Sequence, residues 1–219
     1  MVGSVPTAST VPLPRRPLDP DAPGAFDPAA GPVARPRHWY ENDLGWATVP
    51  GRPLRLVTGV RFDVLDVPAE AGAGALRHLA PDSPVALEGD RMRLLVAPGS
   101  AEELPGLLDW LEWSAVTLDL RALGEGGAME APAPPEAARA ARPWAETLQG
   151  AAVWMRPPGA GGEVEASLPA LPAMGRGQGA PDLVRLLDTV AAQCHRIRLR
   201  RPRTGPPAAC RRDQPLAFS

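Results

Sequence analysis

The sequence predicts an α+β fold in a single domain with one mixed sheet, and three observations lead to this class. Short runs of apolar residues, some alternating with charged ones, mark strands at 54–57, 62–67 and 92–96. Leucines at helical spacing mark helices that begin near residues 100 and 182. Strands and helices that alternate in this way along the chain pack as layers around one core.

The distribution of proline sets the expected limits of the domain. Proline is dense over residues 1–36, 132–143 and 201–215 and sparse between 54 and 131. We expect disordered termini, because Pro-rich segments without hydrophobic periodicity bury too little apolar surface to fold. The chain is thus divided into a Pro/Ala-rich leader at 1–36, a domain at 37–200 and a basic Pro-rich tail at 201–219. The domain itself consists of a core at 38–131, a linker at about 132–148, a strand at about 149–155 and a helix at about 182–199.

The first half of the domain reads as two strands, a short helix and a hairpin. Pro68 ends the second strand because it lacks the N–H that a ladder of hydrogen bonds requires. Gly89 stands in the hairpin turn, a position that favours glycine. The expected strands are 54–57, 62–67, 84–87 and 92–96, and the expected helix is 69–80.

The second half adds two helices and two further strands. Ser100 and Glu103 have the spacing of a capping box, and a stripe of leucines follows them. Asp182 caps the last helix, whose apolar face includes Leu186 and Cys194. The leucine stripe is Leu104, Leu107, Leu108 and Leu111, with Trp110 and Trp113 beside it as expected packing residues, and the strands are 115–120 and 128–131.

Composition excludes several classes of function. The net charge is −2 and all 23 basic residues are arginine, which we attribute to a GC-rich genome rather than to polyanion binding. Cys194 and Cys210 are too few for a disulfide framework or for a zinc site of cysteine pairs. Neither a signal peptide nor a membrane-spanning run is visible, so we expect a cytoplasmic protein with no membrane partner.

Three short motifs follow one another between residues 58 and 135. The first motif ends in Phe62-Asp63-Val64-Leu65-Asp66-Val67-Pro68. The second is Gly89-Asp90-Arg91-Met92, and apolar residues and Ala97-Pro98 follow it. The third is Asp119-Leu120-Arg121, which is followed by Gly126-Gly127. In this order the motifs resemble the prim–pol domain of the archaeo-eukaryotic primase superfamily, found in bifunctional DNA primase/polymerases. The chain looks like a reduced, small actinobacterial member of that family.

The resemblance implies a metal site of which this chain keeps only a part. In the family, an Asp-x-Asp strand and a further Asp hold divalent metal, and a histidine meets the nucleotide phosphates. Asp66 and Asp119 stand at two of these positions, whereas Pro68 and Met92 replace the second Asp and the histidine. Because neither replacement offers the lost chemistry, we expect no cofactor. If activity remains, Asp66 and Asp119 are the residues expected to hold Mg²⁺ or Mn²⁺.

Two other acidic residues are candidates for completing the carboxylate set. Asp63 precedes Asp66 by three residues, which places it on the opposite face of a regular strand. It could join Asp66 only through a bulge, which we do not expect. Glu130 is the second candidate. His78 and His195 have no ligand partner at a useful spacing.

Arginines are the expected phosphate contacts. Arg121 belongs to the third motif, and a run of arginines ends the last helix, where cations also suit the helix dipole. That run is either a solvated tail or a phosphate-contacting arm. The candidates are Arg121, Arg196, Arg198, Arg200, Arg201 and Arg203.

The missing ligands favour a non-catalytic prim–pol-like module with a binding or regulatory role, whose partner is nucleic acid or a nucleotide. An active primase/polymerase-type nucleotidyltransferase with a reduced metal site is the first alternative. A protein-interaction adaptor, with Pro-rich flanks that dock a partner, is the second.

Overall fold

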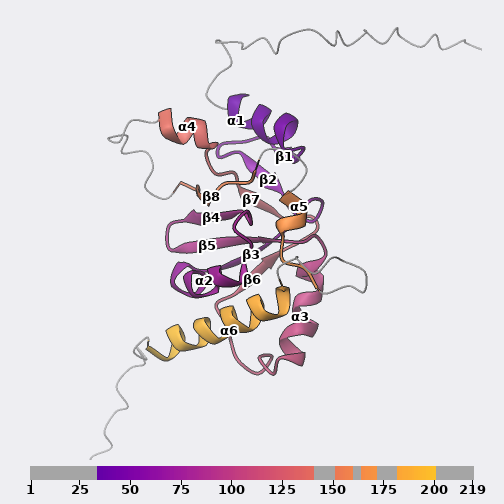
Figure 1. Cartoon of the computed structure of the whole chain (residues 1–219), viewed down its shortest axis with the longest axis vertical. Coiled ribbons are helices and arrows are strands. Elements are labelled where there is room, and N and C mark those ends of the chain that lie inside the picture. The colour runs from indigo at the N-terminus through magenta and orange to yellow at the C-terminus, as the bar shows by residue number, and fades with distance from the viewer. Residues whose placement is uncertain (1–33, 141–150, 160–163, 172–181, 201–219) are drawn as a thin grey trace, which may run out of the picture.

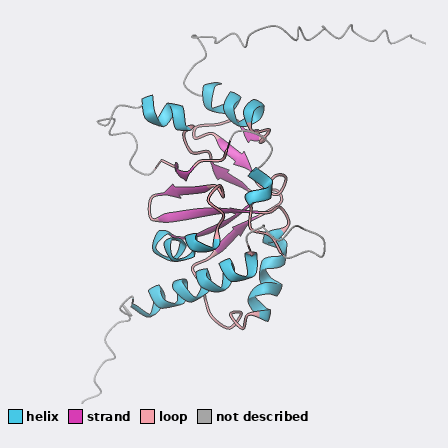
Figure 2. Ribbon diagram, viewed as in Figure 1, coloured by secondary structure: helices cyan, strands magenta, loops and turns pink. Residues whose placement is uncertain are grey.

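A computed structural model describes residues 34–140, 151–159, 164–171 and 182–200 (Figure 1). Helices and antiparallel sheets combine in an α+β fold, which confirms the expected class (Figure 2). The leader up to residue 33, the tail from residue 201 and the start of the strand expected at 149–155 lie outside the described residues.

A five-stranded sheet forms the centre of the fold. Its strand order is β6-β3-β5-β4-β8, and every neighbouring pair is antiparallel. The longest ladder joins β3 to β5 in regular register, from Asp63 opposite Val96 to Pro68 opposite Arg91. The strands are β3 (Asp63–Pro68), β4 (Val85–Glu88), β5 (Arg91–Val96), β6 (Arg121–Leu123) and β8 (Val153–Arg156).

Two strands that were expected in the central sheet, at 54–57 and 128–131, belong to a second sheet instead. It contains β1 (Thr48–Val49), β2 (Arg55–Val57) and β7 (Ala128–Glu130) in the order β1-β2-β7. The expected single mixed sheet is therefore two antiparallel sheets. The chain leaves the small sheet after β2 through a tight turn at Gly59, whose N–H donates to the carbonyl of Phe62 at 2.9 Å.

Three helices cover one face of the central sheet: α2 (Ala69–Ala75), α3 (Ser100–Trp110) and α6 (Leu183–Arg200). Figure 1 shows them gathered at one end of the molecule. Small residues let α2 approach its neighbours closely, since Gly72 lies under Met92 and Gly74 against Gln193. Met92 is buried in this core, as expected of an apolar side chain. The buried face of α6 is Leu183, Leu186, Leu187, Val190, Cys194 and Ile197.

The other face of the central sheet packs against the small sheet, a π-helical turn at Trp39–Asp43 and α5 (Val164–Ser167). Aromatic residues dominate this second core. The Tyr40 hydroxyl donates to the carbonyl of Pro132 at 2.6 Å and accepts from the Trp154 indole at 2.9 Å. These bonds join segments far apart in the chain, so they hold β8 and the end of the small sheet to the same core.

Local structure differs from the expectations at three places. Residues 115–120 are not a strand; segment 111–120 is a loop, and the strand begins only at Arg121. The loop packs Leu118 and Leu120 against the helical core and gives backbone carbonyls to α6, instead of pairing with a neighbouring strand. The expected linker at 132–148 contains α4 (Pro135–Ala140), and α1 (Ala34–His38) begins within the expected leader.

Candidate functional site

The structure brings Asp66 and Asp119 together through the side chain of Arg91. The Arg91 guanidinium donates from Nε to Asp66 Oδ1 at 2.5 Å and from Nη1 to Asp119 Oδ1 at 2.7 Å. Its Nη2 also donates to the main-chain carbonyl of Asp66 at 2.9 Å. A charged guanidinium thus stands between the two carboxylates that the sequence singled out. We call these three residues the Asp66–Arg91–Asp119 cluster.

Strand register explains how the cluster forms. Asp66 on β3 lies opposite Arg93 on β5, and Arg91 enters β5 two residues earlier, directly after the hairpin turn. Side chains two residues apart share a face of the sheet, so Arg91 and Arg93 both point to the face of Asp66. Asp119 comes from the loop that precedes β6. The cluster was missed at the sequence level, although the expected hairpin already placed Arg91 beside the strand of Asp66.

Further ion pairs extend the cluster across the sheet. Arg93 Nε lies 3.5 Å from Asp66 Oδ2, and its Nη1 forms an ion pair with Glu88. Burial raises the pKa of Glu88, although Arg93 opposes that shift. Both arginines of β5 therefore have carboxylates beside them.

The carboxylates of the cluster stabilise the charged form of Arg91. Burial alone would lower the pKa of Arg91, but hydrogen bonds to Asp66 and Asp119 outweigh that effect and raise it. Charge-assisted bonds of this kind are shorter and stronger than neutral ones. The two carboxylates consequently already have a fixed positive partner that supplies charge and directed donors.

Asp63 lies on the opposite face of β3 and takes no part in the cluster. It is fully buried, and its Oδ2 accepts from the backbone N–H of Ala101 at 2.9 Å, at the start of α3. Burial raises the pKa of Asp63, while the backbone donors of this helix start oppose the shift. The regular register of β3 contains no bulge, so the expected separation of Asp63 from Asp66 is confirmed.

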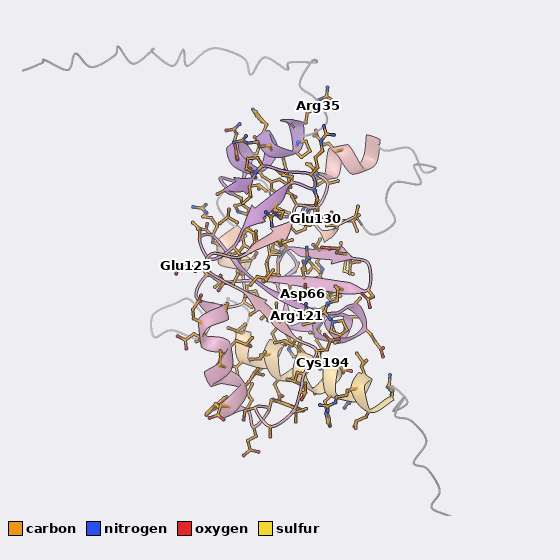
Figure 3. All side chains as sticks on the ribbon, turned by 180° about the vertical axis from the view of Figure 1, so that it is seen from behind. Arg35, Asp66, Arg121, Glu125, Glu130 and Cys194 are labelled. Atoms are coloured by element: carbon orange, nitrogen blue, oxygen red, sulfur yellow. The ribbon has the colours of Figure 1, made fainter. Side chains whose placement is uncertain are left out.

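Glu130 does not complete the carboxylate set through a direct contact with the cluster. It lies on β7 in the small sheet, and its Oε1 accepts from the backbone N–H of Ala152 at 3.4 Å. Figure 3 shows Asp66 and Arg121 close together, with Glu130 further toward the small sheet. Within the described residues, no group of three or more His, Cys, Asp or Glu side chains could hold a metal ion.

The expected phosphate-contacting arginines are divided between two surfaces. Arg121 on β6 lies opposite Asp66 on β3 in the strand register, so the two residues share a face of the sheet. The Arg121 side chain is exposed and has no side-chain partner in the described part of the chain. The α6 arginines lie across the sheet, on the helical face. Arg198 Nη1 donates to the carbonyl of Thr117 at 2.8 Å, and Arg200 Nη1 to Glu70 at 2.9 Å, while Arg196 is exposed. Arg201 and Arg203 lie outside the described residues.

Most of the remaining candidate residues have packing roles. Trp113 Nε1 donates to Asp188 Oδ1 at 3.0 Å, and its ring lies 5.9 Å from the ring of His195. His78 Nε2 lies 2.9 Å from the hydroxyl of Thr189. Burial raises the pKa of the Cys194 thiol to about 11, so this thiol stays protonated. Trp110 was expected to pack in the same way, but it is 71% exposed.

Comparisons of the chain with protein-family models, with curated proteins and with solved structures found no match. The resemblance to a prim–pol domain therefore depends on the three sequence motifs. No helix among the described residues is long and apolar enough to cross a membrane.

Proposed function

We propose that this protein is a non-catalytic module of the prim–pol type that binds nucleic acid or a nucleotide. The observation that carries the proposal is the position of Arg91 between Asp66 and Asp119. Nucleotidyl transfer by two metal ions requires carboxylates that are free to coordinate both ions. Here a side chain of the protein itself occupies the space between the two carboxylates that remain.

The neighbouring replacements support the same conclusion. Pro68 ends β3 on the face of Asp66 without offering a ligand atom, and Met92 is buried under α2. Phosphoryl transfer depends almost entirely on positioned charge around the triphosphate. A guanidinium supplies a fixed positive charge, but it cannot bridge an attacking hydroxyl to the triphosphate as a metal ion does.

The binding part of the proposal depends on the basic end of α6. Arg196 is exposed there, Arg198 and Arg200 lie two and four residues further along the helix, and Arg201 and Arg203 follow in the sequence. Cations at a helix C-terminus are favoured by the helix dipole, and the arginine fork matches phosphate geometry. Because the whole chain carries a charge of −2, binding driven by this local surface is expected to be weak and non-specific.

We expect no template-dependent nucleotide incorporation by this chain with Mg²⁺ or Mn²⁺. Primer extension and de novo priming over both metals measure this, with Asp66→Ala and Asp119→Ala as controls. Incorporation that either substitution abolishes would contradict the proposal. It would mean that Arg91 leaves its position and that the two carboxylates act in catalysis.

Binding to single-stranded DNA is expected to weaken steeply as salt increases, because phosphate contacts release counterions. Fluorescence anisotropy of a labelled oligonucleotide measures the affinity across a salt series. Replacing Arg196 with Ala should reduce the slope of log K against log salt by about 0.7 for each phosphate that the variant no longer neutralises. Arg185→Ala is the matched control, since Arg185 is exposed at the other end of α6.

Two outcomes would contradict this part of the proposal. Equal losses of affinity in the Arg196 and Arg185 variants would show that the basic end of α6 is not the binding surface. Affinity that survived high salt and removal of residues 201–219 would place the contact on the sheet face around Arg121 instead.

A further inference from the structure

The outer face of α3 carries an exposed tryptophan. Trp110 is 71% exposed, whereas Ser100 and Leu104 on the inner face of the same helix are buried. Glu103 and Gly106 precede Trp110 by seven and four residues, so all three share the outer face. Space beside Gly106 is open, since a side chain added there would meet no atom within 4 Å. Exposed tryptophan next to open space is typical of a recognition surface.

The segment of chain that carries Trp110 has charge of only one sign. Residues 94–120 contain no Lys, Arg or His, and they include Glu102, Glu103, Asp109 and Glu112. All four are exposed. In the described ranges, neither Glu103 nor Glu112 forms an ion pair. The outer face of α3 and the turn that follows it therefore combine an aromatic ring with carboxylates that form no ion pair within the described residues.

Arginine is the side chain that fits such a surface best. Its guanidinium stacks on an indole face and bonds to a carboxylate in a bidentate fork, so one residue satisfies both features. The chain contains 23 basic residues, all of them arginine. Its tail between residues 201 and 212 has Arg201, Arg203, Arg211 and Arg212 and no acidic residue.

We propose that the outer face of α3, together with the turn that follows it, is a docking surface for the basic tail of the same chain, with Arg211 and Arg212 at Trp110, Glu103 and Glu112. Charge complementarity supports this choice of occupant. This contact holds or fails independently of whether the protein binds nucleic acid.

The chain is long enough for this contact. The start of α6 lies near α3, because Trp113 bonds to Asp188 in the second turn of α6. The 18 residues of α6 lead away from that point over about 27 Å. An extended segment from residue 201 to Arg212 spans about 40 Å, which is enough to return along the helix.

Tail docking has a consequence for any polyanion that uses the same arginines. Carboxylates of α3 then compete with phosphates for Arg211 and Arg212, so the helix acts as an internal competitor. Such competition is electrostatic and weakens as salt screens both partners.

Cys210 offers a direct test because it precedes the two arginines. A thiol-reactive nitroxide reagent should label Cys210 selectively, since Cys194 is 2% exposed and its pKa is raised to about 11. In the full-length protein we expect the amide signals of residues 106–113 to lose about twofold or more of their intensity relative to those of α1, which lies at the other end of the molecule (Figure 1).

Matched variants distinguish specific docking of the tail on α3 from non-specific proximity of the tail to the domain. Trp110→Ala and Glu103→Gln should restore the intensity of the α3 signals. Leu199→Ala and Glu136→Gln should not, although they also remove an exposed apolar group and an exposed carboxylate. Trp110 and Glu103 are both exposed, so the fold should survive these changes, and the unperturbed spectrum of α6 checks this.

Two results would overturn the proposal. Uniform signal loss over the whole domain, or loss centred on another element, would show that the tail has no preference for α3. Loss that appears only when labelled and isotope-enriched molecules are mixed would assign the contact to a second copy of the chain.

Discussion

Replacing Leu186 with alanine is expected to lower the free energy of unfolding by about 2–5 kcal/mol. Leu186 is fully buried on α6, within the core that joins α2, α3 and β5. Truncation there removes apolar contacts and leaves a cavity in a close-packed region. Denaturant melts of both proteins measure the difference.

Leu108→Ala is the matched control for that experiment. Leu108 belongs to the leucine stripe of α3, but it is only partly buried. We expect a smaller loss of about 1–2 kcal/mol, in proportion to the apolar surface that it shields from water. Equal losses in the two variants would contradict the packing of α6 described above.

Replacing Gly59 with alanine is expected to destabilise the fold by about 2–5 kcal/mol, from backbone strain and overpacking together. Gly59 has φ +88°, and an added Cβ would lie 2.5 Å from the backbone nitrogen of Glu125. Neighbouring bonds hold the same turn, since Thr58 donates from Oγ1 to the carbonyl of Gly124 at 2.6 Å. Neither chain segment can move without breaking these bonds.

The Gly126→Ala variant distinguishes the backbone strain of a positive φ from the steric overlap of an added Cβ. Gly126 also has a positive φ, of 73°, but a side chain there would meet no atom within 4 Å. Only the backbone strain of the positive φ remains, so the free energy of unfolding is expected to fall by about 1–2 kcal/mol in the same melts. A larger loss for Gly126 than for Gly59 would contradict the close approach of the two loops.

Local patterns were sufficient to predict the elements with strong periodicity. The strand ending at Pro68, the hairpin and the last helix lie close to their expected bounds, because alternation and leucine spacing reflect burial directly. Segment 115–120 shows why the same signal can fail. Its apolar residues alternate as in a strand, but they pack against helices from a loop that the carbonyl bonds of Thr117 and Asp119 hold to α6.

The arrangement of the sheets and of the cluster depends on contacts that no local pattern contains. Division of the strands into two sheets is decided by pairing between β2 and β7, which are far apart in the chain. The role of Arg91 depends on the register of β3 and β5 and on the path of the loop that carries Asp119. The sequence identified both carboxylates, but the cation between them became visible only in three dimensions.

A cation that belongs to the chain behaves differently from one that is bound. Arg91 is covalently attached next to Asp66 and Asp119, so its effective concentration there does not depend on the supply of metal outside the protein. A chelator cannot remove it, and dilution cannot empty the position. Loss of Arg91 alone would remove the ion pair of Asp119, whereas Asp66 would keep Arg93 Nε at 3.5 Å from its Oδ2.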